Sequence, residues 1–142
     1  MNPYGLHFAF LDPYNLADLE FCIIKALSKL KRIDMLIHVS AMDFQRNFER
    51  NISSIGRVFD KFAPGWRTVV DLNSSKASAR QKLFEYWRDQ VAQLCTDTAN
   101  NVRLIIGGNN QRLYWLLLAA KHELARKFWG VATNVEKQGK LL

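Results

Sequence analysis

Two short apolar runs that flank a helix-length segment constrain the fold more than any other feature of this sequence. Residues 6–11 (LHFAFL) and Ile33–Ser40 (IDMLIHVS) each have the length and the apolar content of a buried strand. Between them, from residue 16 onward, apolar side chains recur at the spacing of one helical face: Leu19, Ile23, Leu27 and Leu30. A strand, a helix and a second strand in this order predict a crossover connection and a parallel strand pair.

The segment after residue 41 carries an aromatic pattern that is typical of a long helix. Its apolar residues are spaced by four and three: Phe44, Phe48, Ile52, Ile55, Phe59 and Phe62. We expect Asp43 to cap this helix, and Pro64 and Gly65 to end it. Residues 66–72 are compatible with a short strand or with a packed connector, and a further amphipathic helix is expected from about residue 77 to residue 98.

The C-terminal third predicts a β-hairpin. Val102–Ile106 and residues 113–120 are apolar runs on either side of the turn-forming segment GGNNQ, so the last strand should run antiparallel to its neighbour. A final helix is expected from about residue 123. The whole pattern predicts an α/β fold with a mixed sheet of about four strands and a C-terminal antiparallel hairpin, flanked by helices. We expect one domain over residues 1–133 and a frayed tail over residues 134–142.

The charge balance favours an anionic partner. Twenty Lys and Arg residues against 13 Asp and Glu residues give a formal net charge of +7, which is typical of contact with nucleic acid, although solubility alone also explains it. Arg46, Arg50 and Arg57 would share one face of the long helix, where they can bind phosphates. A solvated helix surface is the alternative interpretation of this face.

Several classes of protein are disfavoured by what the sequence lacks. The longest apolar stretch is far shorter than the ~20 residues of a membrane-spanning helix, and no secretion signal is recognisable, so we expect a cytoplasmic protein without membrane contact. Cys22 and Cys95 are isolated and far apart, which predicts reduced thiols and no metal site. No glycine-rich strand-to-helix turn and no order of catalytic Ser, His and Asp can be traced.

The best candidate site follows the first strand. In open α/β sheets, ligands bind beyond the carboxyl ends of the parallel strands, and Asp12, Pro13, Tyr14 and Asn15 occupy such a position. The Asp12 carboxylate and the Pro13 carbonyl can accept hydrogen bonds from an amino group, and Tyr14 can stack on a planar base. The alternative is an ordinary turn in which Asn15 caps the next helix.

The second strand ends on the same side of the expected sheet. His38 lies near its end, and Asp43 and Arg46 follow just beyond it, so with Asn15 and Arg50 they are candidates for binding a substrate or a nucleic acid. A histidine within an apolar strand is more often packed than catalytic, and this remains the alternative for His38.

Three segments of the chain carry a family resemblance. GLHFAFLDPYNLADLEFCIIKAL, RIDMLIHVSAMDFQRN and LYWLLLAAKHELARKFW resemble the three-Cys-motif partner protein family, over residues 5–129. Members of this family are similar to class I S-adenosylmethionine-dependent methyltransferases. The resemblance implies a partial Rossmann-like sheet, the C-terminal half of such a fold, in which residues 6–11 are the fourth strand and the last two strands pair antiparallel.

The resemblance also implies a site. Asp12, Pro13 and Tyr14 match the position of the Asp/Asn-Pro-Pro-Tyr motif of amino-group methyltransferases, without its second proline. By this match they are the catalytic residues: Asp12 accepts the amine, and Tyr14 stacks on the acceptor.

The family implies S-adenosylmethionine as the cofactor. The glycine-rich half that would bind it does not occur in this sequence, so we expect little or no catalysis by the chain alone. The alternative is a non-catalytic module that binds nucleic acid or protein. An apolar strand edge left uncovered by the missing half should form a homo-oligomer.

Overall fold

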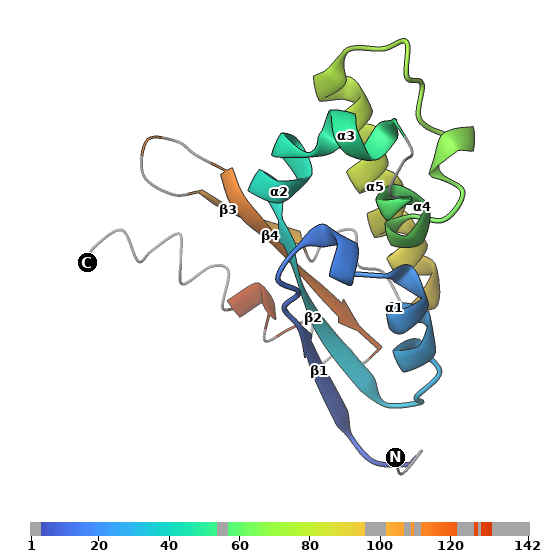
Figure 1. The fold of residues 1–142 in the computed structure, drawn as a ribbon. Coiled ribbons are helices and arrows are strands. Elements are labelled where there is room, and N and C mark those ends of the chain that lie inside the picture. The colour runs from blue at the N-terminus through green and yellow to red at the C-terminus, as the bar shows by residue number, and fades with distance from the viewer. Residues whose placement is uncertain are drawn as a thin grey trace.

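The computed structural model describes residues 4–53, 57–95, 102–106, 109, 112–121, 127 and 129–131 (Figure 1). Its four strands are β1 (His7–Leu11), β2 (Ile33–Ser40), β3 (Val102–Ile106) and β4 (Arg112–Ala120). The α-helices with assigned bounds are α1 (Phe21–Ser28), α2 (Ala41–Arg46), α3 (Phe48–Ile52), α4 (Val58–Phe62) and α5 (Lys76–Leu94). Short 3-10 helices span Leu16–Asp18 and Trp66–Thr68. The expected α/β class is therefore confirmed.

The four strands form one mixed sheet in the order β1-β2-β4-β3. β1 and β2 are parallel, with Ala9 opposite Met35, as the crossover pattern predicts. β4 is antiparallel to β2 and to β3, which confirms the expected antiparallel pair at the end of the sheet. Since β4 lies between them, β2 and β3 run in the same direction.

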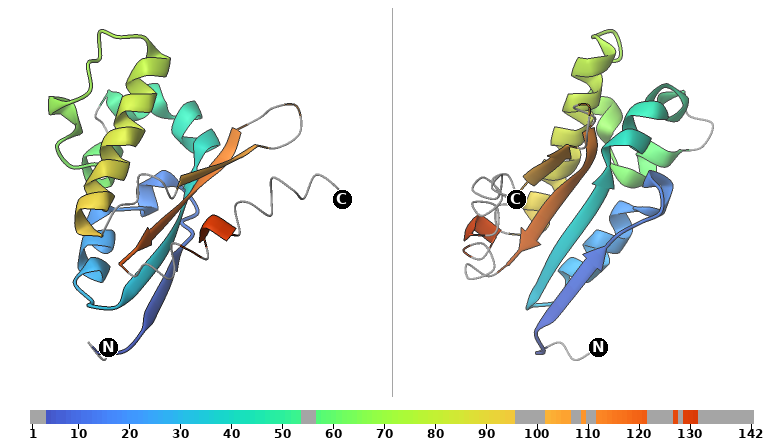
Figure 2. Two further views of the ribbon diagram at one scale, coloured as in Figure 1. Left: turned by 180° about the vertical axis from the view of Figure 1, so that it is seen from behind. Right: turned by 90° about the vertical axis from the view of Figure 1, so that its left-hand side faces the viewer.

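The helices α1 to α5 gather on one side of the sheet, with α5 extending along it (Figure 2). The burial pattern of β2 explains why the helices pack on this face. Every second side chain of the strand is fully buried, and the side chains between them are half-buried. The core lies between this face of the sheet and the helices. It is rich in aromatic residues, of which the largest are Phe44, Phe48, Phe59, Phe62, Trp66 and Trp87.

The prediction of one long helix over residues 44–62 is wrong. The chain leaves helical geometry at Asn47, where φ is −101° and ψ is 8°, and again at Arg57, where φ is 50°. The aromatic residues of the pattern are nevertheless buried together, and the rings of Phe44 and Phe59 lie 5.5 Å apart. The apolar spacing therefore correctly predicted which residues are buried, but it wrongly predicted an unbroken helix.

Two capping predictions have different outcomes. The Asn15 side chain accepts a hydrogen bond from the backbone N–H of Asp18 at 3.2 Å, so its predicted capping role is confirmed, although it caps a 3-10 turn. Asp43 is not the cap of its helix, because α2 begins two residues earlier and Ser40 Oγ accepts the Asp43 N–H at 3.1 Å.

The helix expected from residue 77 to residue 98 is observed as α5, whereas residues 66–72 form a 3-10 turn and a connector rather than a strand. Of the final helix expected from residue 123, residues 127 and 129–131 are helical, and the rest lies outside the described residues, as does the tail over residues 134–142.

Candidate functional site

Asp12 and His38 meet at the end of the sheet. Asp12 follows β1 and His38 lies on β2, and the Oδ1 and Nδ1 atoms of these two side chains are 3.2 Å apart. The pair is within ion-pair distance but is not aligned as a hydrogen bond, and Nδ1 has no hydrogen-bond partner among the described residues. Because β1 and β2 are parallel, their carboxyl ends lie at one edge of the sheet, and this brings the two residues together.

Tyr114 completes this group, which we call the Asp12 cluster: Asp12, His38 and Tyr114. The rings of His38 and Tyr114 lie 4.5 Å apart and are tilted by 44°. Tyr114 is opposite Ser40 in the β2–β4 pairing, so it stands on the same sheet face as His38, the face away from the helices. Sequence analysis missed Tyr114, because nothing local indicates that β4 pairs with β2. The sequence signal that could have identified Tyr114 is a polar aromatic residue near the start of an apolar strand.

Pro13 and Tyr14 continue the chain beyond the Asp12 cluster. Pro13 is half-buried, and Tyr14 is 97% exposed. The Tyr14 ring is therefore open to contact from solvent, as a stacking residue must be in the absence of its ligand. Neither residue lines either of the two pockets described below.

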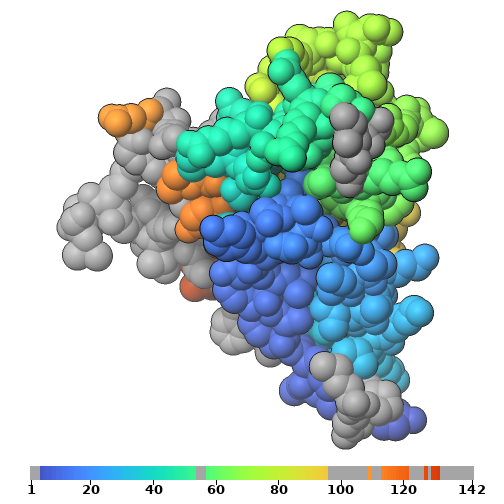
Figure 3. Space-filling view, viewed as in Figure 1, coloured from blue at the N-terminus to red at the C-terminus, as the bar shows by residue number. Residues whose placement is uncertain are grey.

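A polar cleft of about 620 Å³ lies beside this edge of the sheet. The cleft lies between the segment after β1 and the helices α2, α3 and the start of α4. Figure 3 shows the surfaces of the segment after β1 and of α2 meeting on one face of the molecule. The residues lining the cleft are Asn15, Ala17, Asp43, Asn47, Arg50, Asn51, Ser53 and Val58. Three predicted site residues, Asn15, Asp43 and Arg50, thus come together in this cleft.

Asp43 holds the cleft together rather than facing a ligand with free oxygens. Its Oδ2 accepts the backbone N–H of Leu16 at 2.9 Å, and its Oδ1 accepts the Asn47 side-chain N–H at 2.6 Å. Both carboxylate oxygens are therefore occupied. Arg50 differs, because it is exposed and no hydrogen bond or ion pair engages its side chain in the described part of the chain, so its guanidinium is available to an anion.

The predicted basic face of the long helix does not form, since Arg46 belongs to α2, Arg50 to α3 and Arg57 precedes α4 with left-handed backbone geometry. Arg46 is exposed and does not line the polar cleft. Among the residues that line the cleft, Arg50 is the cation.

The described residues at the ends of β1 and β2 do not fit an S-adenosylmethionine pocket. The turn between β1 and the first 3-10 helix contains no glycine, and β2 passes directly into α2. The N-termini that follow are occupied by Asn15 and Ser40 as caps, which leaves no open glycine-rich cradle for a cofactor at these strand ends.

The described residues contain neither a metal-binding group nor a membrane-spanning helix. No group of three or more His, Cys, Asp or Glu side chains could hold a metal ion in this part of the chain. Within the same residues, no helix is both long enough and apolar enough to cross a membrane.

Comparison of the chain with protein-family models, with curated proteins and with solved structures finds no match.

Proposed function

We propose that this chain is the acceptor half of a methyltransferase-like domain of the three-Cys-motif partner type, completed by a donor-binding half that other residues supply. The observation that carries this proposal is the strand order. β1, β2 and β3 run in one direction in chain order, like the last three strands of a doubly wound 3-2-1-4-5-6 sheet, and the antiparallel β4 is inserted between the last two. The antiparallel pair at the end of the sheet agrees with the resemblance to class I methyltransferases.

The Asp12 cluster supplies the acceptor chemistry of this proposal. One Asp12 oxygen faces His38 Nδ1, and the other is available to accept a hydrogen bond from the amino group of a base. His38 lies beside the carboxylate at 3.2 Å, and Tyr114 packs against the imidazole ring. Tyr14, fully open to solvent, stacks on the base that carries the amino group.

Nucleic acid is the acceptor class that we propose. The net charge of +7 attracts a polyanion, and Arg50 in the polar cleft offers a phosphate contact near the strand ends that hold Asp12. Because the described strand ends have no cradle for S-adenosylmethionine, the chain alone binds the acceptor and does not catalyse methyl transfer.

The test compares two single-stranded oligonucleotides that differ in one amino group. Oligo(dA) carries the exocyclic amine and an oligonucleotide of 2′-deoxynebularine, whose base is unsubstituted purine, does not, so fluorescence anisotropy should show at least about tenfold tighter binding of oligo(dA), as one hydrogen bond to a carboxylate implies. The D12A substitution should abolish the preference, whereas D18A, at an exposed aspartate nearby, should retain it. Equal affinities of the unmodified protein for both oligonucleotides, or saturable binding of S-adenosylmethionine in calorimetry, would contradict the proposal.

Self-association is a second candidate function, and it rests on the edge strand. β1 lies at the edge of the sheet, and its side chains Phe8 and Phe10 are 67% and 54% exposed. The strand HFAFL has no Lys, Arg, Asp or Glu residue, the charges that natural proteins place on an edge to prevent pairing. Pairing of β1 with β1 of a second copy around Ala9 would set Phe8 opposite Phe10 of that copy, and this contact would be the same from both sides.

Light scattering tests the homo-oligomer. The unmodified protein should be a dimer, and F8K should be a monomer because it places a charge on the pairing face. I23K is the matched control, since Ile23 is also an exposed apolar residue but lies on α1. A monomeric unmodified protein at high concentration would exclude pairing through β1.

A further inference from the structure

We infer that the cavity between α2, α5 and β4 is a second binding site, separate from the Asp12 cluster, and that its ligand is a nucleoside monophosphate unit. The cavity has a volume of about 570 Å³, within the range of small-molecule sites. Its lining residues come from segments far apart in the chain: Ala41, Phe44, Gln45, Ala77, Arg80, Gln81, Phe84, Glu85, Arg88 and Trp115. We call it the aromatic pocket.

The aromatic pocket and the Asp12 cluster lie on opposite faces of the sheet. Tyr114 and Trp115 are consecutive on β4, and consecutive strand residues point to opposite faces. Tyr114 packs against His38, whereas Trp115 packs against Phe84 of α5. The inference therefore concerns a different surface from the proposed acceptor site and does not depend on it.

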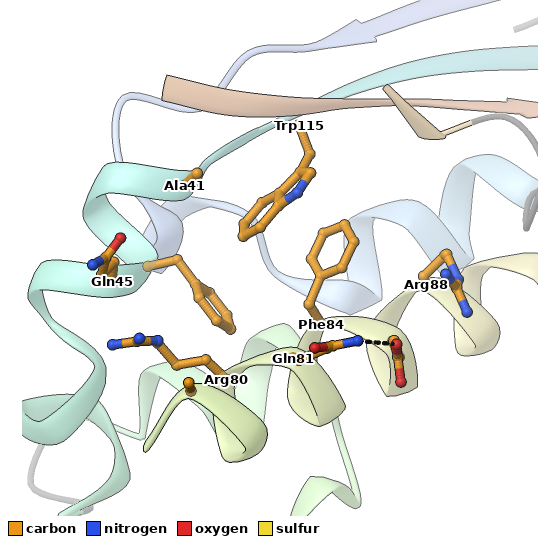
Figure 4. A pocket seen from close by; sticks show the side chains of 10 residues that line it. Ala41, Gln45, Arg80, Gln81, Phe84, Arg88 and Trp115 are labelled. Carbon is orange, nitrogen blue, oxygen red and sulfur yellow. Dashed lines mark hydrogen bonds between the residues drawn. The ribbon is translucent and has the colours of Figure 1, made fainter. Parts of the chain in front are cut away.

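The floor of the pocket is a rigid aromatic group. The rings of Trp115 and Phe84 are stacked with centroids 4.2 Å apart, and the Trp115 ring meets Phe44 edge-on at 5.8 Å. Figure 4 shows Trp115 and Phe84 projecting into the space between β4 and the helices, and Phe44 also lines the pocket. Trp115 is half-buried, so part of this floor is exposed to the cavity. A planar base would bury apolar area against Trp115, the ring of this floor that is not in the buried core.

Arg80 is the cation on the rim that lacks a counter-charge. It is half-buried, and none of the described residues forms an ion pair or hydrogen bond with its side chain. The other charged rim residues are engaged, since Glu85 accepts a hydrogen bond from Gln81 at 3.0 Å and Arg88 lies 3.2 Å from Asp89. Figure 4 shows Arg80 extending toward Gln45 along the rim. A guanidinium in this position suits a phosphate, which it can bind with two parallel hydrogen bonds.

The pocket combines an aromatic floor, an unpaired arginine and the amides of Gln45 and Gln81. This combination fits a whole nucleotide better than a nucleoside or a sugar phosphate alone. The base would occupy the floor, and the phosphate would reach Arg80. This chemistry is shared by a free mononucleotide and by the 5′-terminal unit of a phosphorylated single strand.

Calorimetry with AMP, adenosine and ribose 5-phosphate tests the site on the full chain. AMP should bind saturably, and each of the two part-molecules should bind at least about tenfold more weakly, because each loses one of the two contacts. R80A should reduce AMP affinity to that of adenosine. K82A should leave it unchanged, because Lys82 is an exposed cation of the same helix outside the pocket.

The source of the ligand is resolved by competition. If a 5′-phosphorylated oligonucleotide displaces AMP and its unphosphorylated form does not, the site takes the end of a strand; if neither displaces AMP, it takes the free nucleotide. W115F, checked for folding by circular dichroism, should weaken adenosine binding and spare binding of ribose 5-phosphate. Absence of saturable AMP binding, or equal AMP affinity of R80A and K82A, would overturn the inference even if W115F fails to fold.

Discussion

The backbone N–H of Leu16 donates a hydrogen bond of 2.9 Å to Asp43 Oδ2, which links the segment after β1 to the first turn of α2 across 27 residues of sequence. Leu16 is buried, and the bond is part-buried at the wall of the polar cleft. D43A should therefore lower the free energy of unfolding by about 1 kcal/mol, the cost of a lost hydrogen bond. Urea denaturation measures the change.

D43N and D18A are the controls for that substitution. An asparagine can accept from Leu16 or from Asn47 but presents an N–H to the other donor, so D43N should recover only part of the loss. D18A removes an exposed carboxylate of the same segment and should change stability by less than about 0.5 kcal/mol. A D43A protein as stable as D18A would show that the link does not support the cleft.

Lys121 connects the end of β4 to the end of α1. Its ammonium donates to the backbone carbonyls of Ser28 and of Leu30, the latter at 2.9 Å. A cation at this position satisfies carbonyls that the helix leaves unpaired at its C-terminus. K121M should destabilise the protein by about 1 kcal/mol, as thermal or urea unfolding would show. K29M removes an exposed lysine at the same helix end and should have little effect; equal effects of the two substitutions would exclude the specific contact.

Gly65 occupies a position that only glycine fits. Its φ of 86° is strained for other residues, and a Cβ there would lie 2.7 Å from the Tyr86 hydroxyl, which donates a hydrogen bond of 2.6 Å to the Pro64 carbonyl. G65A should cost about 1–3 kcal/mol of stability. The cost should be smaller when it is measured in a Y86F background, because the clash is then removed. G130A, where an added Cβ meets nothing within 4 Å, should stay within about 1 kcal/mol of the unmodified protein.

The two thiols should differ in reactivity and in their effect on stability. Burial raises the pKa of the Cys95 thiol above its ordinary value, an effect that the Lys121 charge opposes and the Asp34 charge reinforces. Cys22 is exposed. At pH 8, an alkylating reagent should therefore modify Cys22 rapidly and Cys95 only on unfolding, as mass spectrometry of the labelled peptides would show.

The raised pKa of Cys95 also fixes the sign of a pH dependence. At neutral pH the thiol is protonated in both states, and its contribution to stability is constant. Above that pH the unfolded chain releases the proton first, so the free energy of unfolding falls as the pH rises toward the folded pKa. C95A should lack this component. Parallel stability curves of the unmodified protein and C95A between pH 8 and pH 10 would contradict it.

Local pattern predicted the strands well and the helices less well. The bounds of β2 and β3 agree with the apolar runs in the sequence, because a buried strand is recognisable from its own residues. The break at Asn47 was not recognisable, since Phe44 and Phe48 keep helical spacing across it while both remain in the core. The insertion of β4 between β2 and β3 depends on pairing such as Asp34 with Ala120, which no local window contains.

The candidate site was likewise predicted where local sequence was sufficient and missed where it depended on tertiary pairing. Asp12 and His38 were each predicted from their place after or near the end of a strand, and the fold brings them within 3.2 Å of each other. Tyr114 was missed because it reaches His38 through the β2–β4 pairing. The role of Asp43 as a link between segments was also missed, since its partner Leu16 is identified by the fold and not by spacing.

The most direct test of the proposed acceptor site is an NMR titration of the ¹⁵N-labelled protein with oligo(dA). We predict chemical-shift changes at the amides of Asp12, Tyr14 and His38 that follow one binding curve, and in D12A the changes at Tyr14 and His38 should require higher oligo(dA) concentrations. Saturable binding that leaves these three amides unshifted would show that the end of β1 does not bind the base.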